Sequence, residues 1–389
     1  MKMYIYRYGS ICEPDMINAF KNLGFSVYEE TIEIYNKTLL PSECVEHVSP
    51  KLINGEFSFV FSINFFPWLS DLCNIIHIPY LCLIVDSPVL ELYSKSIDNE
   101  YNRIFLFDKA LYNEFSRYNP KHIFHIPLSG DVIRMTNVIE SASYDTLKKY
   151  SCDISFIGST YEEKCPFNKA KLPPYEAGFA DGIIEAQLKV YGYNFIQEVI
   201  SDEFVDTLRK CTPEFYKFPA GFRADYKAVA AQLYLSVKVA EQERIRVLKA
   251  LSERFNVDIY TGSPMDKLPA IHNCGFAKSI EEMPLIFNQS KINLNITAKS
   301  IRSGLSQRIF DVLACQGFLI TNYQAELPEY FEIGKDLVTY ESIEDLCDKC
   351  SYYLKHEDER IEIAKHGHET LKKFHTTNTR ILQMLNIAF

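Results

Sequence analysis

One uninterrupted run of the chain, from Ile292 to Asn322, restricts the possible folds more than any other segment. It begins as an apolar strand, continues through a polar loop that contains glycine, becomes helical and ends in a second apolar strand. Within the predicted helix, Ile309, Val312 and Leu313 have the i, i+3, i+4 spacing of a buried stripe. Gly317 is predicted to end this helix in a left-handed conformation. The run therefore predicts one strand–helix–strand unit of a parallel sheet, with a loop that suits phosphate groups.

Two charged residues, Arg308 and Asp311, stand near the start of this helix and on neighbouring parts of one face. The backbone amides from Gly304 to Gln307 precede the first helical hydrogen bonds and are expected to point outward. Outward amides and a guanidinium favour a diphosphate, and a carboxylate one turn deeper can accept hydrogen bonds from both ribose hydroxyls. An ordinary surface pair between Arg308 and Asp311 is the alternative explanation.

Length and charge exclude several classes of protein. The chain has 389 residues, enough for two or three domains, and 47% of them are hydrophobic, as in a globular protein. Its 41 basic and 51 acidic residues give a net charge of −10, which disfavours nucleic-acid and anionic-membrane partners. The first residues lack the apolar core of a signal peptide, and no stretch approaches the roughly 20 apolar residues of a membrane span. We expect a soluble, cytoplasmic protein with no membrane span.

The first 145 residues alternate strand and helix patterns, as a doubly wound parallel sheet requires. Predicted helices cover 14–23 and 68–76. Predicted strands cover 4–8, 25–29, 57–63, 80–85, 103–107 and 123–126.

A second domain is predicted at 146–370. It opens with a strand at 152–157 and the turn Gly158-Ser159-Thr160. Strand signals then disappear over about 162–241, which predicts a helical insertion, and the alternation resumes with strands at 257–261 and near 274–276. The last segment, 371–389, is predicted to be a helix that packs back on the first domain. The expected fold class is α/β, with two doubly wound domains facing each other across a cleft.

Polar residues at the carboxyl ends of predicted strands indicate where ligands bind in such sheets. In the second domain these residues are Asn295 and Thr297, which either reach a ligand or cap the following loop. In the first domain they are Asn64 and Asp86. Asp86 would serve as a general base, or it would instead cap the following helix. Asn64 would orient an acceptor, or it would instead complete a turn.

Several ordered motifs resemble one family, the CgeB-like glycosyltransferases. In the carboxyl half they are Asn293-Leu-Asn295, Gly304 to Ile320, Phe331 to Tyr340, Tyr353-Leu, Ile363-Ala-Lys-His-Gly367 and His375-Thr. In the amino half they are Phe61-Ser-Ile-Asn64, Ile78-Pro-Tyr80, Val85-Asp-Ser-Pro88, Phe105-Leu-Phe-Asp108 and Ile126-Pro-Leu128. The resemblance covers most of the chain except the insertion. It implies the GT-B architecture, in which the Rossmann-like carboxyl domain binds a nucleotide sugar and the amino domain, also Rossmann-like, carries the acceptor site.

The resemblance also implies roles for individual residues. Asp311 takes the position of the acid that binds ribose hydroxyls in the GT-B clan, where many relatives have Glu. Many retaining relatives carry a second acid eight residues earlier, where this chain has Ser303. This difference argues against the retaining mechanism of those relatives. The other donor-binding candidates are Gly158, Ser159, Thr160, Tyr260, Gly262, Phe276, Ala277, Lys278, Asn295, Thr297, Arg302, Gly304, Leu305 and Ser306. Among them, Tyr260 or Phe276 would face the base, although either aromatic ring could instead belong to the core.

Transfer of a sugar requires the departing diphosphate to be stabilised. The chain contains no Asp-x-Asp motif of the kind that holds a metal in GT-A enzymes. Arg308 is therefore the first candidate to stabilise the leaving group, and we expect no metal and no cofactor. Cys347 and Cys350 form a lone Cys-x-x-Cys pair without a matching histidine, which predicts ordinary buried cysteines.

These inferences predict a cytoplasmic glycosyltransferase with Asp86 and Arg308 as catalytic residues. The donor would be a nucleotide sugar, most simply a UDP-sugar, and the transferred group a hexose or N-acetylhexosamine. The acceptor would be a glycan or a protein of a surface layer, spore or flagellum. A non-catalytic sugar-nucleotide-binding protein is the alternative. A two-lobed periplasmic receptor is disfavoured by the missing signal peptide and the eleven scattered cysteines.

Overall fold

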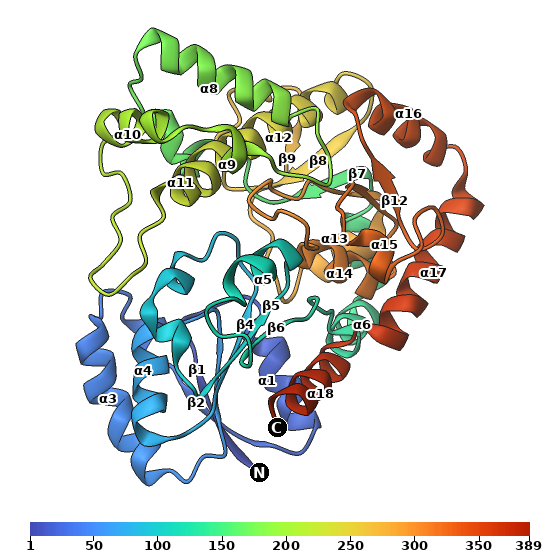
Figure 1. Cartoon of the computed structure of the whole chain (residues 1–389). Coiled ribbons are helices and arrows are strands. Elements are labelled where there is room, and N and C mark those ends of the chain that lie inside the picture. The colour runs from blue at the N-terminus through green and yellow to red at the C-terminus, as the bar shows by residue number, and fades with distance from the viewer. The chain divides into compact units, whose positions relative to one another are not determined.

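The computed structural model describes residues 1–389, which divide into two compact units (Figure 1). Unit 1 comprises Met1–Ser129, Phe218–Ala224 and Thr376–Phe389. Unit 2 comprises Gly130–Lys217 and Asp225–His375. The division thus falls sixteen residues before the expected end of the first domain at residue 145. The reason is that α6 (Val132–Ser141) and α7 (Tyr144–Lys149) pack on α13 (Met283–Gln289) of unit 2.

Unit 1 contains a parallel six-stranded sheet with the strand order β2-β1-β3-β4-β5-β6. Its strands are β1 (Lys2–Tyr6), β2 (Ser26–Glu30), β3 (Val60–Ile63), β4 (Tyr80–Ile84), β5 (Asn102–Leu106) and β6 (Ile123–His125). Its α-helices are α1 (Glu13–Asn22), α2 (Ile32–Tyr35), α3 (Pro41–Asn54), α4 (Pro67–Ile76), α5 (Lys109–Phe115) and α18 (Thr377–Ala388). Every residue of the central strands β3 and β4 is buried, as expected for strands covered on both faces.

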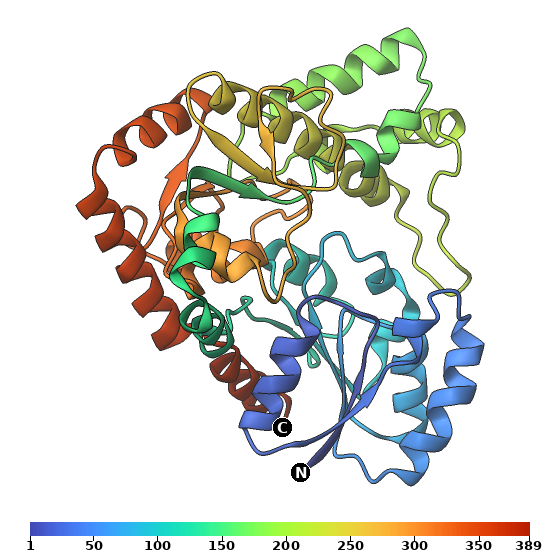
Figure 2. The same ribbon diagram turned by 180° about the vertical axis from the view of Figure 1, so that it is seen from behind.

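Helix α18, the end of the chain, belongs to unit 1 and packs against α1. Figures 1 and 2 both show the two helices side by side, α18 in dark red and α1 in blue. The Arg380 guanidinium fixes α18 further by donating a 3.0 Å hydrogen bond to the Leu128 carbonyl oxygen. Of the segment 371–389, which was predicted to be one helix packed on the first domain, residues 376–389 belong to unit 1, whereas 371–375 belong to unit 2 and include the end of α17.

Unit 2 contains a second parallel six-stranded sheet, with the order β12-β11-β10-β7-β8-β9. Its strands are β7 (Cys152–Ile157), β8 (Val257–Tyr260), β9 (His272–Asn273), β10 (Ser290–Asn295), β11 (Leu319–Asn322) and β12 (Val338–Tyr340). Besides α6, α7 and α13, its helices include α14 (Gln307–Ala314), α15 (Leu327–Tyr330), α16 (Ile343–Tyr353) and α17 (Glu357–Phe374). The predicted α/β class with two doubly wound domains is confirmed.

Between β7 and β8 the chain forms helices and no strand, as the predicted insertion requires. The α-helices of this region are α8 (Pro174–Gln187), α9 (Ile196–Val199), α10 (Asp202–Cys211), α11 (Tyr226–Val229) and α12 (Ser236–Ser252). A π-helical turn, Ala230–Leu235, joins α11 to α12. No helix of the chain is both long and apolar enough to cross a membrane.

Two local predictions are corrected. Residues 274–276 form no strand, because the edge strand β9 already ends at Asn273. Gly317 does not supply the left-handed residue after α14; Gln316 does, with a φ of 56°. Glycine is nevertheless required at 317, since a Cβ there would lie 2.6 Å from the Phe287 carbonyl oxygen and 2.7 Å from the Asn293 side-chain nitrogen. Gly317 thus allows the chain that follows α14 to pack closely against Phe287 and Asn293.

Gly367, inside α17, gives a stability prediction. A Cβ at this position would lie 2.1 Å from the Asp336 carbonyl oxygen and 2.7 Å from a Leu313 methyl. We expect Gly367→Ala to lower the free energy of unfolding by about 3 kcal/mol, because the backbone has to move. Gly182→Ala in α8 is the matched control, with open space around its Cβ and an expected gain of about 0.5–1 kcal/mol. Equal denaturation midpoints for the two variants would contradict this prediction.

Candidate functional site

The strand order of unit 2 places a ligand crevice at one point of the sheet. From β7 the chain continues to β8 and β9 on one side, whereas β10, β11 and β12 follow on the other. The order therefore reverses between β7 and β10, which pair in parallel from Ser290 with Cys152 to Leu294 with Phe156. Ligands of open α/β sheets bind outside the carboxyl ends of the strands at such a switch point.

The loop after β7 is the predicted turn Gly158-Ser159-Thr160, and polar contacts hold it. The Thr160 amide donates to the Ser263 hydroxyl at 2.9 Å, and the Ser159 and Ser263 hydroxyls both donate to Glu163. The Thr160 hydroxyl itself is buried and has no hydrogen-bond partner. A buried hydroxyl without a partner, located at a switch point, is a candidate ligand contact.

Arg244, on α12, joins the two loops at the switch point and was not predicted from the sequence. Its guanidinium donates to the Ser159 carbonyl oxygen at 2.6 Å and to the Ile296 carbonyl oxygen at 2.7 Å. The same group lies over the Tyr161 ring, 4.4 Å from its centre. Since Ser159 follows β7 and Ile296 follows β10, one side chain fixes both walls of the crevice. No local sequence pattern predicts this role of Arg244, because the two loops come together only through the order of the strands in the sheet.

Arg244→Leu should lower both stability and donor affinity. Hydrogen bonds from a charged group contribute about 1.5–3 kcal/mol each, and the variant leaves two carbonyl oxygens without their donor. We expect a loss of about 3 kcal/mol in unfolding free energy by chemical denaturation. Arg246→Leu is the control on the same helix, since the exposed Arg246 side chain pairs with Glu185 and Gln242 at the surface and its loss should cost at most about 1 kcal/mol. If both variants unfolded at the same denaturant concentration, the bridging role would be wrong.

A second polar network ties the end of β10 to the loop before α14. The Asn295 amide donates to the Thr297 and Thr321 hydroxyls, both at 2.9 Å. Its side-chain oxygen accepts from the Ser306 hydroxyl at 3.4 Å. Because contacts within the protein use its donors and its acceptor, Asn295 positions the loop. These contacts are the ones expected for loop capping, and a ligand contact by Asn295 or Thr297 stays a prediction.

The loop at 302–306 leads into α14 as predicted. Gly304 and Leu305 are buried, while Arg302 and Ser306 are half-buried. Ser306 is the N-cap residue, but its side chain accepts no capping hydrogen bond. The first amides of the eight-residue helix therefore have no cap from this side chain and suit an anionic group.

Arg308 and Asp311 occupy the first turns of α14. The Arg308 guanidinium is half-buried against α13, 4.9 Å from the centre of the Phe287 ring and 3.3 Å from the Met283 sulphur. Burial lowers the pKa of this guanidinium; the Asp311 charge opposes this effect and the Arg244 charge adds to it. Asp311 is half-buried and accepts a 2.9 Å hydrogen bond from the Gln307 side chain. Two cations and one carboxylate thus influence one another at this helix start.

The predicted base-binding residues lie on β8 and after β9. Tyr260 is 8% exposed, and burial is the main reason that its pKa is raised, so this ring belongs to the core. Phe276 is 77% exposed and is therefore no core residue. Ala277 is buried, while Gly262 and Lys278 are exposed, and the Lys278 ammonium pairs with Glu281 at 3.2 Å. Of the two aromatic candidates, only Phe276 presents a ring to solvent.

A buried carboxylate lies beside Ser303, where the family resemblance expects an acid. The Ser303 hydroxyl donates to Glu326 at 2.7 Å, and the Glu326 amide donates to the Ser303 carbonyl oxygen at 3.2 Å. Glu326 is only 1% exposed. It comes from the segment after β11, so the local motif around Ser303 could not reveal it.

In unit 1, polar side chains also meet where the strand order reverses, between β1 and β3. The Asn64 amide donates to the Tyr8 hydroxyl at 2.9 Å and to the Asp86 carboxylate at 2.6 Å. Its oxygen accepts from the Val85 amide at 3.1 Å. Asn64 thus links the ends of β1, β3 and β4, and it fixes one oxygen of the exposed Asp86. Asp86 caps no helix, which removes the alternative role considered for it.

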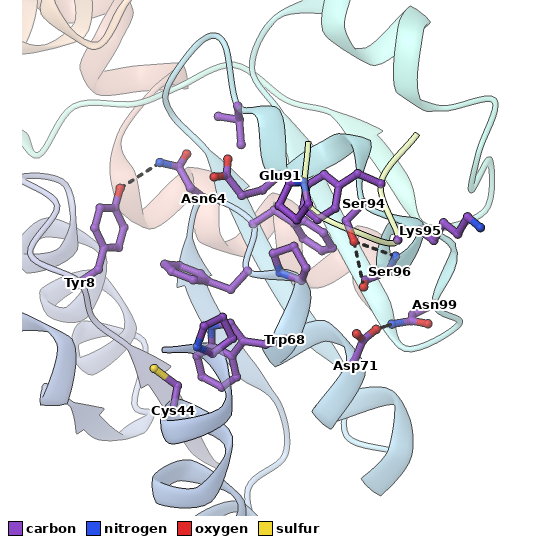
Figure 3. Close-up of a pocket in the computed structure, with 18 of the residues that line it drawn as sticks. Tyr8, Cys44, Asn64, Trp68, Asp71, Glu91, Ser94, Lys95, Ser96 and Asn99 are labelled. Atoms are coloured by element: carbon purple, nitrogen blue, oxygen red, sulfur yellow. Dashed lines mark hydrogen bonds between the residues drawn. The ribbon is translucent and has the colours of Figure 1, made fainter. Parts of the chain in front are cut away.

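Tyr8, Asn64 and Asp86 line a cavity of about 930 Å³ in unit 1. Figure 3 shows its lining, with the Asn64 side chain directed at the Tyr8 hydroxyl and Glu91 nearby. Glu91 is exposed along its side chain, but protein atoms around its carboxyl group raise its pKa, and the Asp86 charge raises it further. The sequence analysis did not predict Glu91.

Unit 2 contains two groups of potential metal ligands. Cys347 and Cys350 are buried, and burial raises the pKa of the Cys350 thiol to about 12, as in ordinary core cysteines. Asp258, His272 and Cys274 bring ligand atoms within 4.8 Å of one another. This group lies at the β8–β9 edge of the sheet, away from the switch point.

Comparison with known families identifies the segment that carries the crevice. Residues 242–386 match the family model described as glycosyl transferase-like. The glycosyl transferase-like segment includes Arg244, the end of β10, α14 and Glu326. It therefore holds most of the donor-binding candidates. No curated protein matches the chain.

Solved glycosyltransferase structures share the fold over the whole chain. A Rickettsia africae glycosyltransferase is 12% identical, with a TM-score of 0.54, and the match covers 100% of this chain and 97% of that one. Anabaena HepE in complex with UDP and glucose is 10% identical, with a TM-score of 0.55 and 99% coverage of both chains. Sucrose-phosphate synthase from Thermosynechococcus elongatus is 8% identical, with a TM-score of 0.54, 100% coverage of this chain and 98% of that one. The fold is that of GT-B glycosyltransferases.

Proposed function

We propose that this protein is a glycosyltransferase whose unit 2 binds a nucleotide-sugar donor and whose unit 1 binds the acceptor. The observation that carries the proposal is the overlap between the glycosyl transferase-like segment and the switch point of the unit 2 sheet. A match to a family model alone would leave the site open. Here the matched segment also contains an uncapped helix start with cations beside it.

The donor is proposed to lie across the switch point. Its diphosphate would contact the α14 amides, the loop 158–160 and Arg308. Asp311 would accept hydrogen bonds from the ribose hydroxyls, and the exposed Phe276 ring would pack on the base. UDP is the proposed nucleotide, supported by the UDP complex of HepE and by the family resemblance.

The acceptor is proposed to bind in the unit 1 cavity, with Asp86 as the general base that removes its hydroxyl proton. Asn64 would orient this carboxylate through the 2.6 Å hydrogen bond. A surface-layer, spore or flagellar acceptor, and a close relation to CgeB-like enzymes, are proposed from the motif resemblance.

Transfer is proposed to need no divalent metal, because amides and guanidinium groups take over the stabilisation of the leaving diphosphate. We expect the purified protein to retain at least half of its transfer rate after dialysis against a chelator. Initial rates with added Mg²⁺ or Mn²⁺ would be measured on the same sample. Activity that disappears in chelator and returns with manganese would overturn this part of the proposal.

Arg308→Ala should lower kcat more than donor affinity, since a charge that develops on the departing diphosphate interacts with the guanidinium most strongly in the transition state. The loss of one such group typically costs about 10²–10³ in kcat. Steady-state kinetics together with calorimetry of UDP binding would separate the two effects. Equal losses in kcat and affinity would assign Arg308 to ground-state binding.

The test of the whole proposal uses the full chain with a panel of radiolabelled nucleotide sugars. A glycosyltransferase should transfer the labelled sugar to an acceptor or release it slowly to water. The alternative, a non-catalytic binder, should raise its melting temperature with the same nucleotide sugar but release no free sugar. Absence of both a thermal shift and sugar release across the panel would reject both functions.

A further inference from the structure

Most of the charged side chains that line the cavity of unit 1 are acidic. Four carboxylates line it, Glu33, Asp71, Asp86 and Glu91, against a single ammonium, that of Lys95. Figure 3 shows the Lys95 side chain extending away from the other labelled side chains. Cations favour the binding of a phosphate or carboxylate group, and carboxylates nearby repel such groups. The cavity therefore disfavours a phosphorylated or acidic acceptor.

Aromatic rings form a continuous wall of the same cavity. The Tyr8 and Phe66 rings lie 5.6 Å apart between centres, and the Phe66 and Trp68 rings lie 6.4 Å apart. All three line the cavity, and none is fully buried. Rings of this kind pack against apolar C–H faces, while the carboxylates around them accept hydrogen bonds from hydroxyl groups. A saccharide combines both features in one molecule.

A strap from the helical insertion closes part of the cavity. This strap, Phe218–Ala224, lies between α10 and α11 in sequence but belongs to unit 1. The Lys95 amide donates to the Gly221 carbonyl oxygen at 3.0 Å, and the Arg223 amide donates to the Tyr93 carbonyl oxygen at 2.7 Å. Its residues 219–222, including the half-buried Phe222, line the cavity. The strap therefore adds a further aromatic residue to the lining.

We propose that this cavity binds the acceptor as a saccharide without phosphate or carboxylate groups, packed on Trp68 and Phe66 and enclosed by the strap Phe218–Ala224. The inference rests on the proposed function, and it names the acceptor class of the proposed acceptor site. It also assigns a role to the helical insertion, because the strap from the insertion forms one wall of the cavity.

The test is binding of the labelled full-length protein, in the presence of UDP, to an array of neutral, phosphorylated, uronic-acid and sialylated glycans. We expect binding to be confined to neutral or amino-sugar glycans. Phe222→Ala and Trp68→Ala should each reduce the signal at least tenfold, while the thermal shift caused by UDP stays unchanged. Tyr35→Ala is the matched control, because Tyr35 is an 86% exposed aromatic residue of unit 1 outside the cavity.

The possible results distinguish failure of this inference from failure of the proposed function. Binding to anionic glycans, or neutral binding that the Phe222→Ala and Trp68→Ala variants retain, would overturn the inference. The inference would also be overturned if the protein bound no glycan while UDP still raised its melting temperature. In that case the proposed nucleotide site in unit 2 would remain supported. Absence of a UDP shift in the unmodified protein would instead reject the proposed function. Phe222→Ala changes a half-buried side chain of the strap, so it keeps the test valid if Trp68→Ala fails to fold.

Discussion

Asp86→Asn should lower the rate of sugar transfer by about 10²–10⁴-fold, the usual contribution of a general base. The amide has the shape of the carboxylate and can still accept the hydrogen bond from Asn64, so the link between β3 and β4 should persist. What the variant loses is the ability to take a proton from the acceptor hydroxyl. Donor affinity should not change, because Asp86 belongs to unit 1 and the proposed donor site to unit 2.

The measurement is kcat with a saturating donor, together with the melting temperature in the presence and absence of UDP. Asp71→Asn is the matched control, since Asp71 lines the same cavity but pairs with Asn99 at 2.8 Å. A less than tenfold loss for Asp86→Asn would show that another group removes the proton. The neighbouring Glu91, whose pKa is raised by the protein atoms around its carboxyl group and by the Asp86 charge, would then be the next residue to test.

Asp311→Ala should weaken UDP binding by about 10–100-fold while the fold remains intact. Hydrogen bonds to a charged acceptor contribute about 1.5–3 kcal/mol, and the proposed ribose contact includes at least one of them. The side chain is half-buried near the start of α14, where it accepts a hydrogen bond from the Gln307 amide, so its loss should affect the helix only locally. Calorimetric titration with UDP measures the change directly.

Two further variants make the Asp311 experiment specific. Asp311→Glu keeps a carboxylate at this position and should bind UDP within about tenfold of the unmodified protein, which separates a ribose contact from a general effect of mutation. Asp348→Ala removes an exposed carboxylate of α16 in the same unit and should leave the affinity unchanged. Unchanged UDP affinity in Asp311→Ala would reject the ribose assignment.

The fold class and most of the helices and strands could be predicted from local sequence patterns. Buried parallel strands must be apolar on both faces, so β3 and β4 appear as continuous apolar runs. The stripe of Ile309, Val312 and Leu313 predicted the buried face of α14, and these three residues are at most 1% exposed. Both signals are local in the chain, which is why they can be recognised without coordinates.

The contacts between side chains of different loops could not be predicted in this way. Arg244 reaches the carbonyl oxygens of Ser159 and Ile296 because the sheet places β7 beside β10, far apart in sequence. The strap Phe218–Ala224 joins unit 1 through backbone hydrogen bonds, which any residue type can make, so its sequence carried no signal. The hydrogen bond between Ser303 and Glu326 likewise joins residues that are distant in sequence. Strand patterns follow from local periodicity, whereas contacts between loops depend on the order in which strands pair, and that order is fixed by packing of the whole sheet.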